Sequence, residues 1–364
     1  MKKLVTSMYI HIPFCNHICT YCDFCKRYYD EKFVSKYLDS LSLEIDQKYQ
    51  KEKLKTLYIG GGTPSSLSIN DLEKLSNIIK KINLDKDYEF TIEVNPENIN
   101  EEKLLIMKKM GVNRISMGVE STSDKFLKYL GRCHNYLEVQ EKIKLMKKIG
   151  FNNINVDLIY AIPNETIIDL KNDLDNILKL DINHISTYSL MINDNTVLGI
   201  QKVKNISEDL DSEMYYYISS YLQEKGFTHY EISNFSKDDH HSHHNLVYWK
   251  NEEYYGIGLG ASGYFNNIRY DNTKSMNNYL KGKYLLNKEE LNKNDIVSYE
   301  LILGFRLING INKKEFYKKY NMELIEQYNI KELIEKGYLI DDGENIKISY
   351  NNIYIENSIL VNFI

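Results

Sequence analysis

The sequence predicts an α/β fold, in which a partial (β/α)6 barrel is followed by a small α+β domain. Two observations favour this fold. Short apolar segments alternate with amphipathic helical patterns through about the first 230 of the 364 residues, and a different pattern of helices and a hairpin follows near the carboxyl end. Repeated strand–helix units form a parallel sheet with helices on the outside. Six units suit an open barrel, whose lateral mouth admits a large ligand.

The barrel elements are predicted from their hydrophobic periods. The expected strands are residues 8–12, 56–59, 89–94, 114–118, 155–159 and 185–190, and the expected helices are residues 33–48, 69–82, 101–110, 136–149 and 167–178. In the second helix, Leu72, Leu75 and Ile79 fall on one face. Asn70 is expected to cap its amino end.

The carboxyl-terminal region is predicted to be a separate module. Helical patterns cover residues 296–307, 313–320 and 330–336, and residues 338–349 are expected to form a hairpin. Helices with such a hairpin look like a winged-helix fold, which often binds DNA. Acidic residues outnumber basic ones in this module, which disfavours phosphate contact. We therefore expect residues 1–235 to form the barrel, 236–294 a connecting region rich in His and Gly, and 295–364 the winged-helix-like domain, which would pack on the barrel or bind a protein.

Composition excludes several functional classes. The formal net charge is -5, whereas a general nucleic-acid binder would be basic. The amino terminus lacks the apolar stretch of a signal peptide, and no apolar run reaches the ~18 residues of a membrane-spanning helix. Only 5 cysteines occur, which fits a reducing compartment. We expect a cytoplasmic protein without an integral membrane segment and without a nucleic-acid partner.

Three cysteines near the amino terminus carry the most information. Cys15, Cys19 and Cys22 follow the spacing Cys-x3-Cys-x2-Cys, which supplies three thiolates to a cluster that takes four ligands. A 4Fe-4S cluster held in this way leaves one iron open. Zinc is the alternative, although zinc sites usually split their cysteines into two separated pairs. Cys25 is not counted as a ligand, and the isolated Cys133 is expected to be structural.

This spacing resembles the signature of the radical S-adenosylmethionine (SAM) enzymes. The resemblance implies that the amino and carboxylate groups of SAM bind the open iron, and that an electron from the reduced cluster then yields a 5′-deoxyadenosyl radical. Radical SAM enzymes also resemble the predicted open barrel in architecture.

Other polar residues are placed where such a cofactor would bind. A glycine run at residues 60–62 ends the second strand, and the carboxyl ends of barrel strands form the active face. Glu93, Glu120, Arg132 and Asp157 lie at or after later strands, where they could bind the ribose hydroxyls and the carboxylate of SAM. Structural ion pairs are the alternative explanation, because an unpaired buried charge is costly.

The order of motifs along nearly the whole chain is similar to that of the oxygen-independent coproporphyrinogen III oxidase-like proteins. The matching segments are residues 9–24, 60–64, 113–119, 130–132, 157–160 and 244–249. Two features resemble the branch of HemW-type heme chaperones rather than the true oxidase: the cluster motif begins early, at Cys15, and Phe24 stands where the oxidase has a further cysteine.

The resemblance implies a set of SAM contacts, and the chain departs from the family pattern at two positions. The implied contacts are Tyr9, Gly61, Gly62, Thr63, Glu93, Glu120, Arg132 and Asp157. Glu120 stands where the family usually has glutamine, and Ala161 where it usually has glycine. The extra negative charge of Glu120 is expected to weaken contact with an acidic group of the ligand.

A histidine-rich segment follows the barrel. His244 begins the pattern His-Asn-x-x-Tyr-Trp, which is similar to the motif through which heme chaperones are thought to hold heme, so His244 is the candidate ligand to heme iron. Two alternatives stay open: a polar surface loop, or a tract that binds another metal. The neighbouring His240, His241 and His243 are expected to be solvated.

A second glycine run, residues 258–263, satisfies the pattern G-x-G-x-x-G. A dinucleotide-binding site would require a helix directly after this run. The residues that follow instead predict a strand, so we reject a nicotinamide site. A plain turn and a glycine-lined wall for a flat ligand both remain open.

Two functions follow from the resemblance. The first is a heme chaperone that binds a 4Fe-4S cluster, SAM and heme and delivers heme to apo-hemoproteins of respiration. The second is a coproporphyrinogen III dehydrogenase, which would form protoporphyrinogen IX by radical oxidative decarboxylation. An unrelated radical SAM oxidoreductase is a third alternative. The cluster would be reduced by an electron donor such as flavodoxin or ferredoxin.

Overall fold

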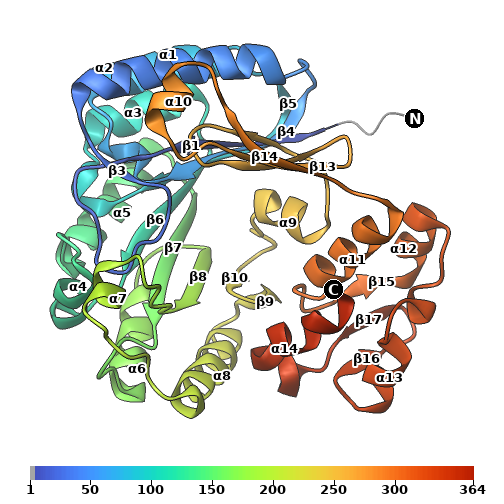
Figure 1. Cartoon of the computed structure of the whole chain (residues 1–364). Helices are drawn as coiled ribbons and strands as arrows, with labels where there is room; N and C mark the ends of the chain where they lie inside the picture. The colour runs from blue at the N-terminus through green and yellow to red at the C-terminus, as the bar shows by residue number, and fades with distance from the viewer. Residues whose placement is uncertain (1–4) are drawn as a thin grey trace.

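A computed structural model describes residues 5–364, and its main feature is a nine-stranded open sheet (Figure 1). The central strands, all parallel and in chain order across the sheet, are β1 (Ser7–Ile12), β4 (Leu54–Gly61), β5 (Leu84–Val94), β6 (Arg114–Glu120), β7 (Asn153–Tyr160) and β8 (His184–Ser189). One edge adds β11 (Tyr255–Ile257), parallel to β1. The other adds β10 (Asn234–Ser236) and β9 (Thr228–Glu231), both antiparallel to their neighbours. The sheet does not close on itself, so the predicted partial barrel is confirmed.

Helices cover the outside of the sheet (Figure 1). They are α1 (Glu31–Lys48), α2 (Ile69–Ile79), α3 (Glu101–Met110), α4 (Asp124–Leu130), α5 (Tyr136–Ile149), α6 (Ile167–Ile177), α7 (Val197–Ile200) and α8 (Glu208–Glu224). The expected cap of α2 was wrong. Ser68 accepts a hydrogen bond from the backbone N of Asp71 at 3.1 Å, so the helix begins at Ile69 and Asn70 lies inside it.

The core lies between the sheet and these helices. Ile10, Ile59, Ile92, Ile115 and Val156, one from each of five neighbouring strands, are fully buried. Strands of a parallel sheet are covered on both faces and are therefore rich in branched apolar residues. Burial of each such side chain contributes about 1.5–3 kcal/mol, so the strands are held firmly enough to position the side chains at their ends.

Ala161 directly follows β7 in a left-handed conformation, with φ of +62°. This conformation costs a residue with a Cβ about 1 kcal/mol or more, which gives a physical reason for the glycine that the family usually has there. We expect Ala161→Gly to raise the free energy of unfolding by about 1 kcal/mol in urea denaturation. Ala261, the other buried alanine, lies outside the positive-φ region. Ala261→Gly should therefore lower the same free energy, and a loss of stability in both variants would contradict the argument.

The connecting region begins with the short helix α9 (His243–Trp249), which contacts β4. The backbone N atoms of His243 and His244 both donate to the Glu89 carboxylate, at 3.0 Å each. Glu89 is the central residue of β5. Helix α9 is thereby held against the barrel strands, and its Asn245 lines the cavity inside the barrel.

The residues after the glycine run of 258–263 are in strands, as predicted, although the first strand already begins inside the run at Ser262 and a second follows from Ile268. An antiparallel sheet contains β12 (Ser262–Phe265), β13 (Ile268–Asn272) and β14 (Leu285–Glu290), with helix α10 (Met276–Leu280) between the last two strands. Gly260 has φ of +72°, and a Cβ on it would lie 2.8 Å from Cβ of Cys25. The run is a tight turn packed beneath the loop that carries the cysteines, and strands rather than the helix of a dinucleotide site follow it.

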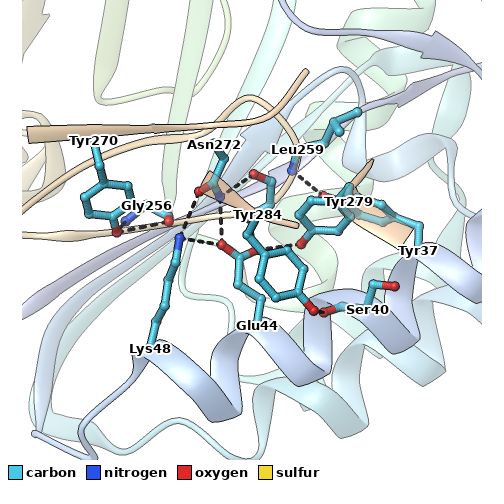
Figure 2. A network of polar contacts seen from close by, with 11 residues as sticks. Tyr37, Ser40, Glu44, Lys48, Gly256, Leu259, Tyr270, Asn272, Tyr279 and Tyr284 are labelled. Carbon is cyan, nitrogen blue, oxygen red and sulfur yellow. Dashed lines mark hydrogen bonds and ion pairs between the residues drawn. The ribbon is translucent and has the colours of Figure 1, made fainter. Parts of the chain in front are cut away.

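A buried polar network holds this region against helix α1 (Figure 2). Its centre is Glu44, whose side chain is fully buried. The carboxylate accepts four hydrogen bonds, from Lys48 Nζ (2.7 Å), Asn272 Nδ2 (2.7 Å), Gly258 N (2.9 Å) and the Tyr279 hydroxyl (2.6 Å). The four donors satisfy both carboxylate oxygens, and they come from α1, the glycine turn, β13 and α10.

The carboxyl-terminal module has its own core, which includes Leu301, Phe305 and Phe316. Its elements are α11 (Lys293–Gly304), β15 (Ile311–Asn312), α12 (Lys313–Tyr320), α13 (Ile330–Glu335), β16 (Leu339–Asp341), β17 (Asn345–Ile348) and α14 (Glu356–Leu360). The helices and the three-stranded sheet β15-β17-β16 agree with the predicted α+β domain. The module lies beside the barrel (Figure 1) and is joined to β9 by backbone hydrogen bonds, Ile232 N to Arg306 O and Ile308 N to Tyr230 O. In residues 5–364 no helix has the length and apolar character to cross a membrane.

Candidate cofactor site

A cavity of about 470 Å³ opens at the carboxyl ends of the barrel strands. Its walls contain most of the residues singled out from the sequence: Cys15, Cys19, Cys22, Gly61, Gly62, Thr63, Glu93, Glu120, Arg132 and Asp157. They come from the cluster loop, from β4 to β7, whose carboxyl ends the parallel sheet brings to one edge, and, in the case of Arg132, from the loop after α4. Tyr9 and His244 are absent from the lining.

The three predicted cluster ligands face this cavity together. Cys15 ends the short strand β2 (Phe14–Cys15) and is buried, and its Sγ accepts a hydrogen bond from Thr63 at 3.5 Å. Cys19 Sγ accepts from Nη1 of Arg132 at 3.4 Å. Within the described part of the chain, no three metal-ligating side chains converge on one point, as a single metal ion would need; the thiols share a cavity instead. Burial raises the pKa of Cys15 to about 11.

Cys25 lies apart from these three. It does not line the cavity, and its Sγ would be only 2.9 Å from a Cβ placed on Gly260. Its backbone oxygen accepts from Nε2 of His11 at 2.7 Å. The side chain of Cys25 is therefore packed against the glycine turn, on the other side of the loop.

The glycine run of β4 lies directly against the cluster loop. A Cβ on Gly62 would meet the carbonyl carbon of Pro13 at 2.8 Å and Sγ of Cys15 at 3.0 Å. Only glycine lets the two backbones approach this closely. Gly61 N donates to the Glu93 carboxylate at 2.9 Å, so this backbone is also held from the side of β5.

Arg132 supplies a buried cation with an unused donor. Its Nη2 donates to the carbonyl oxygen of Gly118 at 2.6 Å, and its Nη1 lies 3.9 Å from Oε1 of Glu120. Its Nε is buried and has no hydrogen-bond partner. A buried donor without a partner is costly, so an anionic ligand group such as the carboxylate of SAM fits this wall of the cavity.

Three carboxylates, those of Glu93, Asp157 and Glu120, line the remainder of the cavity. Burial raises the pKa of Glu93 to about 7, although Gly61 N and the Tyr58 hydroxyl stabilise its anion. Burial also raises the pKa of Asp157, which accepts from Asn155 Nδ2 at 2.8 Å. Carboxylate oxygens at this depth are acceptors suited to ribose hydroxyl groups.

Glu120, where the family usually has glutamine, has a partner of its own. Its Oε1 accepts from the Tyr21 hydroxyl at 3.0 Å. Burial raises its pKa to about 7, while the nearby Arg132 opposes that rise. Its backbone has φ of +65°, at a point where the pairing of β6 with β7 is irregular. Arg132 thus compensates the extra negative charge of Glu120, so that the ligand does not meet an unpaired carboxylate.

Of the two predicted residues outside the lining, Tyr9 is half-buried and His244 is buried. Tyr9 lies on β1, where its hydroxyl contacts Nδ1 of His11 at 3.0 Å and its ring is 6.0 Å from that of Tyr58. His244 is 1% exposed, and both ring nitrogens are occupied: Nδ1 by the Thr56 hydroxyl at 2.8 Å and Nε2 by the Tyr248 hydroxyl at 2.7 Å. Burial lowers the pKa of His244 to about 3, so its imidazole is neutral.

Sequence reasoning missed other residues that line the cavity. Tyr21, Tyr58, Arg114 and Asn155 all contribute to its walls. Tyr21 lies between two cluster cysteines, which was a usable signal. Asn155 and Tyr58 alternate with apolar residues on barrel strands. The local sequence does not show which of the two alternating sets of side chains points into the barrel.

The fold and the cysteine-lined cavity define a radical SAM protein, and comparison with known proteins agrees. Residues 9–177 match the model of the Radical SAM superfamily, and residues 291–351 match that of the HemN C-terminal domain. The coproporphyrinogen III oxidase HemN of Escherichia coli has the same fold, with a TM-score of 0.87 at 20% identity over 99% of this chain and 90% of that one.

Relatives that match along nearly their whole length show to which family of radical SAM proteins the chain belongs. The heme chaperone HemW of Lactococcus lactis is 39% identical over 100% of this chain and 98% of its own length. The heme chaperones HemW of Bacillus subtilis and Escherichia coli are 36% and 30% identical, each over 98% of this chain. The chain belongs to the HemW family of radical SAM proteins.

Membership of this superfamily implies a 4Fe-4S cluster and SAM. The cavity fits both groups, because it offers three thiols on one loop, an orphan arginine donor and several buried acceptors. When bound, the cluster supplies an electron and an iron with an open coordination position.

Proposed function

We propose that the protein is a cytoplasmic heme chaperone, which binds heme and delivers it to apo-hemoproteins of respiration. The observation that carries this proposal is the full-length similarity to several proteins named heme chaperone HemW. The free state of all five cysteines is compatible with a reducing compartment. The rival function, decarboxylation of coproporphyrinogen III, has the fold of HemN in its favour, but that likeness is at 20% identity and concerns the fold alone.

We infer that Cys15, Cys19 and Cys22 hold the cluster. The proposed contacts of SAM are Gly61, Gly62, Thr63, Glu93, Glu120, Arg132 and Asp157, all of which line the same cavity, and Tyr9 behind them. Arg132 would bind the carboxylate through its unused Nε, and the buried acids would accept from the ribose.

We propose that His244 is a ligand to heme iron in a heme-bound conformation in which helix α9 has moved. In the present arrangement neither ring nitrogen is free, because Thr56 and Tyr248 occupy both. The neutral imidazole is the form that binds iron. Ligation through Nε2 requires the Tyr248 hydroxyl to leave, and the helix has only seven residues to hold it in place.

Hemin titration of three variants tests this ligation. His244→Ala should weaken hemin binding at least tenfold and change the Soret band, because the iron loses its ligand. Tyr248→Phe removes the hydroxyl that competes for Nε2 but keeps the ring, so hemin affinity should be equal to or higher than that of the wild type. His243→Ala is the control, because His243 is exposed on the same helix.

A loss of hemin affinity in His244→Ala but not in Tyr248→Phe distinguishes ligation from a merely structural role. If the two variants weaken hemin binding equally, the His244–Tyr248 contact only stabilises α9 and His244 is not the ligand. The rival function is tested separately, by incubating the anaerobically reconstituted protein with coproporphyrinogen III, SAM and a reductant. Formation of protoporphyrinogen IX would contradict a pure chaperone role.

A further inference from the structure

We propose that the part of the cluster loop formed by residues 23–28, together with Lys274, is the docking surface for an acidic one-electron carrier protein. We call this surface the basic loop face. The proposal rests on the assignment of the cluster to Cys15, Cys19 and Cys22, and it adds the place at which the reducing partner binds.

The backbone of the basic loop face is paired directly with that of a cluster ligand. The short strand β3 (Arg27–Tyr28) runs parallel to β2, with Tyr28 opposite Cys15. Tyr29 N donates to the carbonyl oxygen of Cys15 at 2.9 Å. A protein bound on β3 would therefore lie beside the polypeptide that holds the cluster, at the rim of the cavity, which Asp23, Phe24 and Lys26 of this face also line.

Three cations gather on this face. Burial raises the pKa of the Cys25 thiol, and Lys274, Arg27 and Lys26 lie near enough to oppose that rise. The Lys26 ammonium donates to the carbonyl oxygen of Cys22. The side chain of Lys274 approaches the same point at Gly260 as Cys25 does. Arg27 and Lys274 are exposed.

Two acidic groups on or beside the loop, Asp23 and Asp30, make contacts within the chain. The Asp23 carboxylate accepts from Nδ2 of Asn193 at 2.6 Å, and Asp30 caps helix α1. The charge of Asp23 remains, but Lys26, Arg27 and Lys274 outweigh it on this face, and the net positive field attracts an acidic protein and raises its association rate.

Exposed aromatic rings complete the face. Phe24 and Tyr28 are 66% and 65% exposed, although they lie on a loop otherwise tied down by the β2–β3 pairing. Exposed aromatic side chains with a charged rim are typical of the centre of a protein–protein interface. Electron-transfer complexes have some of the smallest protein–protein interfaces. A face made of one short loop and Lys274 therefore suits a transient redox partner better than a permanent subunit.

Anaerobic stopped-flow reduction of the reconstituted protein tests the proposal, with reduced flavodoxin as the acidic carrier. The double variant Arg27→Glu/Lys274→Glu should slow cluster reduction by flavodoxin about tenfold or more at low ionic strength and flatten its dependence on salt. Lys26 is left intact because it contacts Cys22. The matched control is Lys314→Glu/Lys318→Glu, which makes the same change of charge at exposed positions of α12.

A second reductant separates docking from damage to the cluster. Photoreduced 5-deazariboflavin, a small uncharged donor, should reduce the wild type and both double variants at the same rate, with equal iron content. Equal rates with flavodoxin for the wild type and Arg27→Glu/Lys274→Glu would overturn the proposal, as would equal slowing in the α12 control. Failure of the chaperone proposal would appear in the hemin titration instead, so the two failures are distinguishable.

Discussion

Replacement of Cys15 with alanine is expected to abolish binding of the iron–sulfur cluster. Three thiols line the cavity, and loss of one leaves two ligands for a cluster that already has one open iron. The polypeptide should stay folded, because the change to alanine removes only the sulfur atom of one buried side chain. Such a change lowers the free energy of unfolding by about 1 kcal/mol. Iron and sulfide analysis of anaerobically reconstituted protein should therefore fall to background, while far-ultraviolet circular dichroism stays unchanged.

Cys25→Ala is the matched control for this experiment. Cys25 has the same chemistry and lies in the same loop, but its sulfur faces the Gly260 turn. We expect the variant to keep four irons for each chain and the absorption of the wild-type cluster. Loss of iron in Cys25→Ala as complete as that in Cys15→Ala would make Cys25 a fourth ligand, and the open iron position on which the SAM assignment depends would disappear.

The barrel was predictable because its signal is local. Each strand is a short apolar run and each helix a repeating apolar face, and parallel pairing follows from their alternation. The edge strands were not predictable in the same way. β11 joins the sheet beside β1 only because residues 255–257, far away in sequence, return to it, and no local pattern contains that information.

The cofactor cavity was predicted from the sequence for a similar reason. Strand ends gather at one edge of a parallel sheet, so Glu93, Glu120 and Asp157 had to lie together once their strands were known. His244 shows the limit of this reasoning. Its motif indicates the residue, but its orientation depends on Thr56 and Tyr248, which lie on different elements. The importance of Glu44 was likewise invisible, because its four partners come from two separated parts of the chain.

Replacement of Glu44 with alanine is expected to lower the free energy of unfolding by about 3–5 kcal/mol. The carboxylate is fully buried and is the common acceptor for Gly258 N, Asn272, Tyr279 and Lys48 (Figure 2). Its removal leaves buried donors unpaired, each at a cost of about 1–3 kcal/mol. Glutamine is not a conservative replacement here, because its amide NH2 would face two donors whichever way it is turned.

Urea denaturation measures the loss of stability of the whole protein in Glu44→Ala, and hydrogen exchange measures the local loss at the glycine turn. The global unfolding midpoint should fall, and the amide of Gly258, which donates to Glu44, should exchange much faster than in the wild type. Gln47→Ala is the control, because Gln47 is exposed on the same helix and its loss should change the free energy by less than about 0.5 kcal/mol. If Glu44→Ala were no more destabilising than Gln47→Ala, the network would not hold the glycine turn. That turn packs against Cys25, so its release should also loosen the loop that carries the cluster cysteines.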